Sequence, residues 1–270
     1  MRWGERCRSH PRWSKLLEVP MKQKDTELRK HFDNSDELCE YMADLCDGCT
    51  ILAFSTGKDS VVAWLKLRRY FRKIVPYYLY PIPGGPLSFT ERAIKYYEDW
   101  FGCHILRLPH PSVHRMLNDF VDQAPENLRI IEEARLPNID YEDINALVRA
   151  TDPELEDAYQ ASGVRSADSI VRRQSMLKHG QINHKARRWY PAFDYLKADM
   201  IRELDAAQIA LPIDYEWFGR TFDGIDHRFT SVVKEKSPED FERIKLAFPL
   251  VEMDILRQQY RREHHEGGTA

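Results

Sequence analysis

The sequence predicts an α/β fold built on a doubly wound parallel sheet, and three observations support this prediction. Short apolar runs at 50–54, 74–80 and 104–108 have the length and composition of buried strands. The segments between them, from about 59 to 70 and from 88 to 101, show helical spacing of apolar residues. Strands that alternate with helices in this way pair in parallel, with helices covering the sheet.

Start and stop signals place the helices of this first half. Ser35 is expected to be the N-cap of a helix that precedes the first strand, and Gly48 can close that helix. Ser88 and Glu91 have the spacing of a capping box, and Gly102 is expected to end the helix that begins there.

The second half of the chain is expected to complete the sheet and to add helices. A fourth strand should end at Gly163, and "RWYPAF" (188–193) can form a fifth, before a helix over 194–206. Ser237 followed by Pro238 predicts the start of another helix, and the tail from 249 is expected to be helical before it frays. We therefore expect an irregular N-terminal arm (1–33), a main domain (34–220) with an insertion of two helical segments (111–157), and a helical C-terminal extension (221–270).

Composition and charge limit the classes of protein to consider. The chain of 270 residues is 43% hydrophobic and 31% charged, with a net charge of −3, which is ordinary for a globular protein and does not by itself indicate nucleic acid as a partner. No apolar run reaches membrane-spanning length, and the basic start lacks the apolar core of a signal peptide. Five cysteines without the pattern of a disulfide framework fit a reducing compartment, so we expect a cytoplasmic protein without membrane contact.

The segment "STGKDS" (55–60) follows the first apolar run and opens the next helix. A strand-to-helix turn at the carboxyl edge of a parallel sheet presents backbone N–H groups and a helix N-terminus, both of which favour anions. Gly57 permits close approach of a phosphate, and Lys58 can neutralise its charge. Asp59 can cap the helix and help to place a magnesium ion. The segment therefore predicts a phosphate-binding loop, although its spacing is not that of the usual P-loop.

This loop resembles the PP-loop of the ATP pyrophosphatases, whose pattern is S-G-G-x-D-S, and in particular the form found in the phosphoadenosine phosphosulfate (PAPS) reductase-like family. Thr56 stands where that family more often has glycine. Two further blocks occur in the expected order. "GVRSADSIVRR" (163–173) is similar to the family's G-x-R-x-x-E-S-x-x-R element, with Asp168 for Glu. "YPAF…LPIDY" (190–215) is similar to the segment that contains L-P-x-x-Y, here ending in Tyr215.

The resemblance covers most of residues 50–220 and implies a Rossmann-like, adenine nucleotide alpha-hydrolase type of fold, with a PP-loop nucleotide-binding domain over 34–220. It implies that ATP or a related adenylate binds with Mg²⁺, held by Asp59, and that Lys58, Asp59, Arg165 and Arg172 act in catalysis. The adenine would lie near the backbone of 53–55 and 79–80. The nucleotide-binding set that it implies comprises Ala53, Phe54, Ser55, Thr56, Gly57, Lys58, Asp59, Ser60, Leu79, Tyr80, Gly163, Arg165, Asp168 and Ser169.

The cysteines depart from the family pattern. A PAPS reductase needs a nucleophilic cysteine near its C-terminus, and this chain has none after Cys103. The cysteine set of an iron–sulfur cluster is missing as well, so no such cluster is expected. Cys46 and Cys49 form a C-x-x-C pair, for which we favour buried core positions over a redox or metal site. Histidines such as His110 and His184 are expected to have surface or capping roles.

We therefore expect an enzyme that cleaves the bond between the α- and β-phosphates and adenylates a substrate, in nucleic-acid or small-molecule modification. One alternative is a sulfonucleotide reductase or sulfur-transfer component that uses PAPS and a partner's thiol. Another is a non-catalytic nucleotide-binding subunit. The run 165–188 carries seven Lys/Arg against one acid, whereas 126–157 carries ten Asp/Glu against three Lys/Arg. The basic run can extend the nucleotide site, face a nucleic acid or protein partner, or form a solvated helix face.

Overall fold

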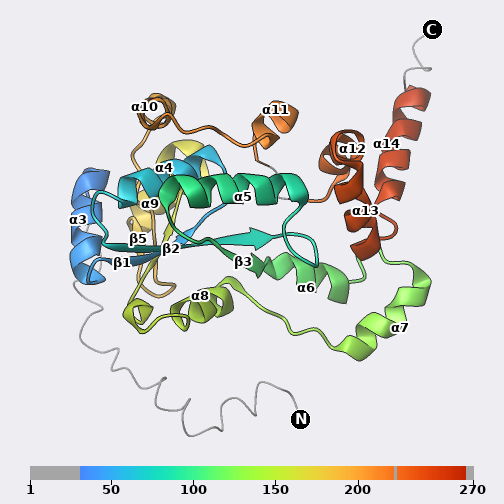
Figure 1. Ribbon diagram of the computed structural model, residues 1–270, viewed down its shortest axis with the longest axis horizontal. Coiled ribbons are helices and arrows are strands. Elements are labelled where there is room, and N and C mark those ends of the chain that lie inside the picture. Colours follow the sequence, from blue (N-terminus) through green and yellow to red (C-terminus); the bar gives the residue numbers. More distant parts are fainter. Residues whose placement is uncertain (1–30, 222–223, 266–270) are drawn as a thin grey trace, which may run out of the picture.

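A computed structural model describes residues 31–221 and 224–265, and shows a six-stranded, mostly parallel sheet with the order β3-β2-β1-β4-β6-β5 (Figure 1). Its strands are β1 (Cys49–Ala53), β2 (Lys73–Tyr80), β3 (Leu106–Pro109), β4 (Gln160–Ser162), β5 (Ile182–Asn183) and β6 (Arg188–Trp189). Only the β5–β6 pair is antiparallel among these strands. The α/β fold with a doubly wound parallel sheet is therefore confirmed.

The direction of winding reverses at β1. From β1 the chain passes through α4 (Lys58–Leu67) to β2, and through α5 (Ser88–Phe101) to β3, moving toward one edge. It then crosses back so that β4 pairs with the other side of β1. Helices α4 and α5 cover one face of the sheet, and α8 (Tyr141–Arg149) lies across the other (Figure 1). The carboxyl ends of β1 and β4 thus form a topological switch point, where ligands of such sheets bind.

Each face of the sheet has its own hydrophobic core. Leu52, Phe54 and Trp64 belong to the core on the α4 side, where the Trp64 ring stacks on Phe101 with centroids 3.7 Å apart. Ile51 and Tyr77 belong to the core on the α8 side. Because β1 is buried on both faces, its sequence is a continuous apolar run without alternation. Helices α3 (Ser35–Leu45), α9 (Ile170–His179) and α10 (Lys197–Ala207) also supply residues to the α4-side core.

The predicted insertion contains one more helix than expected. Residues 111–157 form α6 (Pro111–Asn118), α7 (Pro125–Ala134) and α8, followed by a short 3₁₀ turn (Pro153–Leu155). Helix α7 buries none of its residues, whereas α8 packs Ile144 and Val148 against the sheet. Within the insertion, α7 therefore lies at the surface, whereas α8 packs against one face of the sheet.

The C-terminal region is helical and shares a core with the start of α5. It comprises α11 (Asp214–Phe218), α12 (His227–Lys236), α13 (Pro238–Ala247) and α14 (Glu252–His265). Phe229 and Phe241 pack with Phe89 of α5. The buried Asp240 carboxylate accepts hydrogen bonds from the Ser88 N–H (2.8 Å) and from the hydroxyls of Ser88 and Ser237. In the described residues, no helix has both the length and the apolar character to cross a membrane.

Three predicted helix caps are wrong. Asn34, not Ser35, caps α3, because its Oδ1 accepts the Glu37 N–H at 2.9 Å. Ser88 is the first residue of α5 rather than its cap, since its donors go to Asp240. Asp59 is the second residue of α4, and Gly57 is the N-cap.

The Glu91 of the predicted capping box pairs instead with Arg107, at 2.9 Å. Polar side chains that local spacing assigned to caps are therefore used in tertiary contacts. The sequence interpretation also missed strand β5, and it named a helix in the region of α9 only as one alternative for the basic run. Almost all of the expected arm (1–33), and the end of the tail, lie outside the described residues.

Candidate functional site

The loop between β1 and α4 folds back on the first turn of the helix. The Ser55 N–H donates to Ser60 Oγ at 3.2 Å, and the Ser60 hydroxyl donates to the Gly57 carbonyl at 2.8 Å. The Lys58 N–H donates to the Tyr215 hydroxyl at 2.9 Å, which ties the loop to α11. Gly57 offers no side chain to the free N–H groups at the start of α4. Those donors and the positive end of the helix dipole therefore face the carboxyl edge of the sheet.

Thr56 adopts a left-handed backbone conformation, with φ of +59°. A β-branched residue is strained there, and glycine is favoured. This is the position at which the motif that the loop resembles more often has glycine. Thr56 is buried, and its hydroxyl donates to the Ser55 carbonyl at 2.6 Å. The side chain is therefore turned into the protein.

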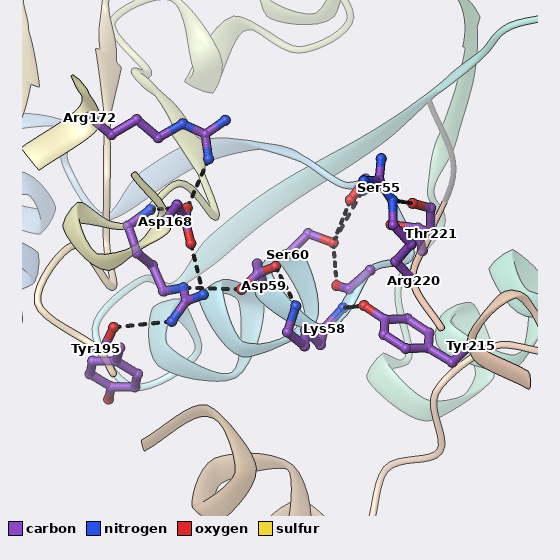
Figure 2. Close-up of polar contacts among 12 residues, drawn as sticks. Ser55, Lys58, Asp59, Ser60, Asp168, Arg172, Tyr195, Tyr215, Arg220 and Thr221 are labelled. Atoms are coloured by element: carbon purple, nitrogen blue, oxygen red, sulfur yellow. Dashed lines mark hydrogen bonds and ion pairs between the residues drawn. The ribbon is translucent and has the colours of Figure 1, made fainter. Parts of the chain in front are cut away.

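A chain of alternating charges runs from the loop to α9 (Figure 2). Lys58 Nζ lies 3.1 Å from Asp59 Oδ2, and Arg165 Nε lies 3.1 Å from Asp59 Oδ1. Asp168 bridges the two arginines, with one oxygen 2.8 Å from Arg165 Nη2 and the other 2.9 Å from Arg172 Nη1. Three cations and two carboxylates leave an excess positive charge at the switch point. Arg165 is held most firmly, because its side chain is only 10% exposed and also donates to the Tyr195 carbonyl.

Gly163 explains how β4 and α4 come so close together. A Cβ atom on Gly163 would lie 2.6 Å from the carbonyl carbon and oxygen of Asp59 and 2.8 Å from the Ser60 nitrogen. These are backbone atoms at the start of a helix, and they cannot rotate away. Only glycine permits this approach, which sets the Arg165 side chain against the Asp59 carboxylate.

A cavity of about 670 Å³ lies at this edge of the sheet. Most of the predicted site residues line it: Ala53, Phe54, Ser55, Lys58, Asp59, Ser60, Leu79, Gly163, Arg165, Asp168 and Arg172. Thr56, Gly57, Tyr80 and Ser169 are not among the lining residues. Ser169 caps α9 instead, since its hydroxyl oxygen accepts the Arg172 N–H at 3.1 Å.

Other lining residues were not predicted as site residues. They are Tyr77, Tyr78, Pro81, Ser112, Ser162, Val164, Arg220 and Thr221. The rule that parallel strands end at one edge of the sheet could have identified the residues at the ends of β2 and β4 and at the start of α6. Arg220 and Thr221 carry no such signal. Thr221 reaches the loop by tertiary folding, and its Oγ1 would lie 2.8 Å from a Cβ on Gly57.

Asp59 and Asp168 are the two carboxylates among the residues that line the cavity. Asp59 Oδ1 is buried and has no aligned hydrogen-bond donor among the described residues, although Arg165 lies within ion-pair distance. The described residues contain no cluster of three His, Cys, Asp or Glu that would hold a metal by themselves. Mg²⁺ commonly binds through one or two carboxylates, water and substrate phosphates. The donor set therefore fits a magnesium ion that arrives with a polyphosphate.

None of the described cysteines lines this cavity. Cys39, Cys46 and Cys49 are buried. Burial raises the pKa of Cys39 to about 12 and that of Cys46 to about 11, which disfavours the reactive thiolate. Their core positions agree with the expected ones.

His110 caps α6, because its Nδ1 accepts the Ser112 N–H at 3.1 Å. It also lines the cavity, and its Nε2 lies 3.1 Å from the Tyr141 hydroxyl. The expected capping role is therefore combined with a place in the cavity wall.

Fold and site together define a doubly wound α/β protein with a cationic cavity at its switch point. Comparison with known proteins adds no family: no family model matches the chain, and no curated protein matches it. Among solved structures, the chain is similar to an NH3-dependent NAD synthetase from Campylobacter jejuni, in complex with a nitrate ion. That match has 10% sequence identity and a TM-score of 0.40, and covers 84% of this chain and 93% of the synthetase. A likeness this distant carries no argument about family or function.

Proposed function

We propose that this protein binds Mg²⁺-ATP or a related adenylate in the cavity at the switch point, cleaves the bond between the α- and β-phosphates and transfers the adenylate to an acceptor. The observation that carries the proposal is the cationic chain of Lys58, Arg165 and Arg172 beside the open N-terminus of α4. The likeness of the 55–60 loop and the 163–173 segment to PP-loop motifs supports it.

The residues of the site have separate roles in the proposed reaction. The α4 N-terminus and Lys58 hold phosphate oxygens, and Arg165 and Arg172 stabilise the charge that develops on the leaving pyrophosphate. An acceptor nucleophile attacks the α-phosphorus, the phosphoanhydride bond breaks, and pyrophosphate leaves with the bond's electron pair. Asp59 would hold Mg²⁺, with Asp168 as the second carboxylate of the cavity lining, and the ion would supply further charge neutralisation when bound. Such a reaction depends mainly on positioning and electrostatics.

The proposed adenine position uses the ends of β1 and β2. The Phe54 N–H already donates to the Tyr77 carbonyl at 2.9 Å, and the Ser55 N–H donates to Ser60 Oγ. These two backbone donors are therefore occupied. We expect the base to be recognised by contact with the side chains and carbonyl groups around Phe54 and Leu79.

The alternative activity, reduction or transfer of sulfur from PAPS, needs a thiol at the cavity. None of the described cysteines lines this cavity, so a partner would have to supply this thiol. A non-catalytic nucleotide-binding subunit would use the same cavity without turnover. In the basic run 165–188, Arg165 and Arg172 line the cavity, which favours its extension of the nucleotide site over a nucleic-acid or protein surface for these two residues.

Calorimetric titration with Mg²⁺-ATP and, separately, with PAPS tests the proposal. We expect ATP to bind, and Lys58→Ala to weaken binding by about tenfold to a hundredfold, since one charge-assisted phosphate contact is lost. The matched control is Lys178→Ala, which removes an exposed lysine of α9 outside the lining. Equal ATP affinity in all three proteins would refute the assignment of the loop. Tighter binding of PAPS than of ATP would favour sulfur chemistry.

A further inference from the structure

A short segment before the C-terminal helices lies against the phosphate-binding loop. Residues 210–221 include α11, and three of them, Tyr215, Arg220 and Thr221, line the cavity. The Tyr215 hydroxyl accepts the Lys58 N–H at 2.9 Å, as Figure 2 shows. Lys58 is the first residue of α4, so this N–H has no acceptor within the helix. Tyr215 thus occupies a donor that a phosphate oxygen would use in the proposed function.

Thr221 covers the glycine of the same loop. A Cβ atom on Gly57 would lie 2.8 Å from Thr221 Oγ1 and 3.4 Å from Thr221 Cγ2. The space that the missing side chain of Gly57 leaves for a phosphate is therefore filled by Thr221. In Figure 2, Tyr215 and Thr221 lie on the same side of the loop, away from Asp168. Two residues of one segment thus occupy two positions of the loop that a phosphate needs.

The start of this segment is fixed to α5. The Ala210 N–H donates to the Tyr96 hydroxyl at 2.9 Å, and the Tyr97 hydroxyl donates to the Ala210 carbonyl at 3.0 Å. Both backbone groups of Ala210 are therefore bound to one helix. A movement of α11 away from the loop can leave this attachment in place.

Helix α11 itself is weakly held against the loop. It has five residues, and Asp214 is the one among them that is fully buried. The Asp214 Oδ1 atom has no hydrogen-bond partner among the described residues, and burial of a carboxylate without partners is unfavourable. A helix of this length has little stability of its own. Its half-buried Trp217 packs on Phe89, with ring centroids 5.0 Å apart. A ligand that competes for the Lys58 N–H can therefore displace α11.

We propose that residues 210–221 form an autoinhibitory strap, in which the Tyr215 hydroxyl holds the place of a phosphate oxygen on the Lys58 N–H until a polyphosphate displaces it. This inference rests on the proposed function, because the displacing ligand is the phosphate chain of the nucleotide. The free energy of binding then includes the loss of the hydrogen bond between Tyr215 and Lys58. Trp217 and Phe218 pack against the core of the C-terminal helices, so the strap couples occupancy of the loop to that region.

Tyr215→Phe tests the strap, because it removes the hydroxyl and keeps the ring. Mg²⁺-pyrophosphate, and an ATP analogue with a methylene group between the α- and β-phosphorus atoms, are titrated separately into the full chain by calorimetry. The variant loses a hydrogen bond that only the free protein makes, so we expect both ligands to bind about two- to tenfold more tightly. A tyrosine that contacts the ligand, or that holds the loop ready for it, would give weaker binding instead. Tyr260→Phe, on the exposed face of α14, should bind like the wild type.

Trp217 reports the position of the strap, since no other tryptophan lies within residues 210–221. Saturating pyrophosphate should shift the tryptophan emission to longer wavelength, because Trp217 leaves Phe89 and enters water. This shift should be absent from Trp217→Phe. A tyrosine with a merely structural role would leave the emission unchanged.

The outcomes separate the strap from the proposed function. Equal or weaker binding by Tyr215→Phe, or unchanged emission of the saturated wild type, refutes the strap. Absence of binding by every variant refutes it as well, since the loop then has no ligand to exclude. If pyrophosphate binds more tightly to Tyr215→Phe and the ATP analogue does not bind, the strap stands and the proposed function fails. If the analogue binds equally to both proteins, the proposed function stands without the strap.

Discussion

Gly163→Ala is the substitution that most directly tests how the site is assembled. The added Cβ would lie 2.6 Å from the backbone of Asp59, about 0.8 Å closer than the 3.4 Å at which ordinary van der Waals contact begins. Neither partner can yield by rotating a side chain, so the end of β4 must move away from α4. Overpacking of this kind costs about 1–3 kcal/mol of the free energy of unfolding.

The displacement also affects the nucleotide site. Arg165 follows Gly163 by two residues and lies 3.1 Å from Asp59, so a shift of β4 separates this ion pair. We expect the affinity for Mg²⁺-ATP to fall by about tenfold or more, since a guanidinium contact worth about 1.5–3 kcal/mol is misplaced. Urea unfolding measures the stability, and calorimetric titration measures the affinity.

Gly224→Ala is the matched control, because a Cβ on Gly224 meets no atom within 4 Å. It should leave the nucleotide affinity as it is in the wild type and change the unfolding free energy by no more than about 0.5 kcal/mol. Our account of the β4–α4 contact would be wrong if Gly163→Ala matched this control in both measurements.

Two further predictions concern buried carboxylates. Burial raises the pKa of Asp214 to about 6, above the value of about 3.9 for an unfolded chain, so stability should fall by up to about 3 kcal/mol as the pH rises from 4 to 6. Urea unfolding at pH 4 and pH 7 should show this loss in the wild type and not in Asp214→Asn; a loss of the same size in both would contradict the assignment. For Asp240, burial raises the pKa, but hydrogen bonds from Ser88 and Ser237 outweigh it and lower the net value, so the stabilisation is present above pH 4 and is lost on acidification. Asp240→Ala should destabilise by about 2–4 kcal/mol in urea unfolding at pH 7, because the Ser88 N–H loses a charged acceptor, while Glu239→Ala on the exposed side of the same turn should change little.

Local sequence determined two strands of the sheet, one of its helices and the loop. The runs at 50–54 and 74–80 are strands within one residue of the predicted bounds, because strands buried on both faces must be continuously apolar. The helix 88–101 has the predicted ends, and Gly102 closes it with φ of +65°. The segment 55–60 lies at the strand-to-helix turn, as its glycine and polar residues indicate. These features depend on neighbours in the chain, which the sequence displays directly.

Only the tertiary structure decided which partners these residues meet. Ser88 has the sequence of a cap, yet its donors go to Asp240, 152 residues away. Arg165 meets Asp59 because the reversal of winding at β1 brings β4 beside the loop. Tyr215, from α11, meets the Lys58 N–H, 157 residues away in the chain. Periodicity and spacing in the sequence indicate which residues are close along the chain. The ion pairs that define this site join segments that come close only when the helices pack against the sheet.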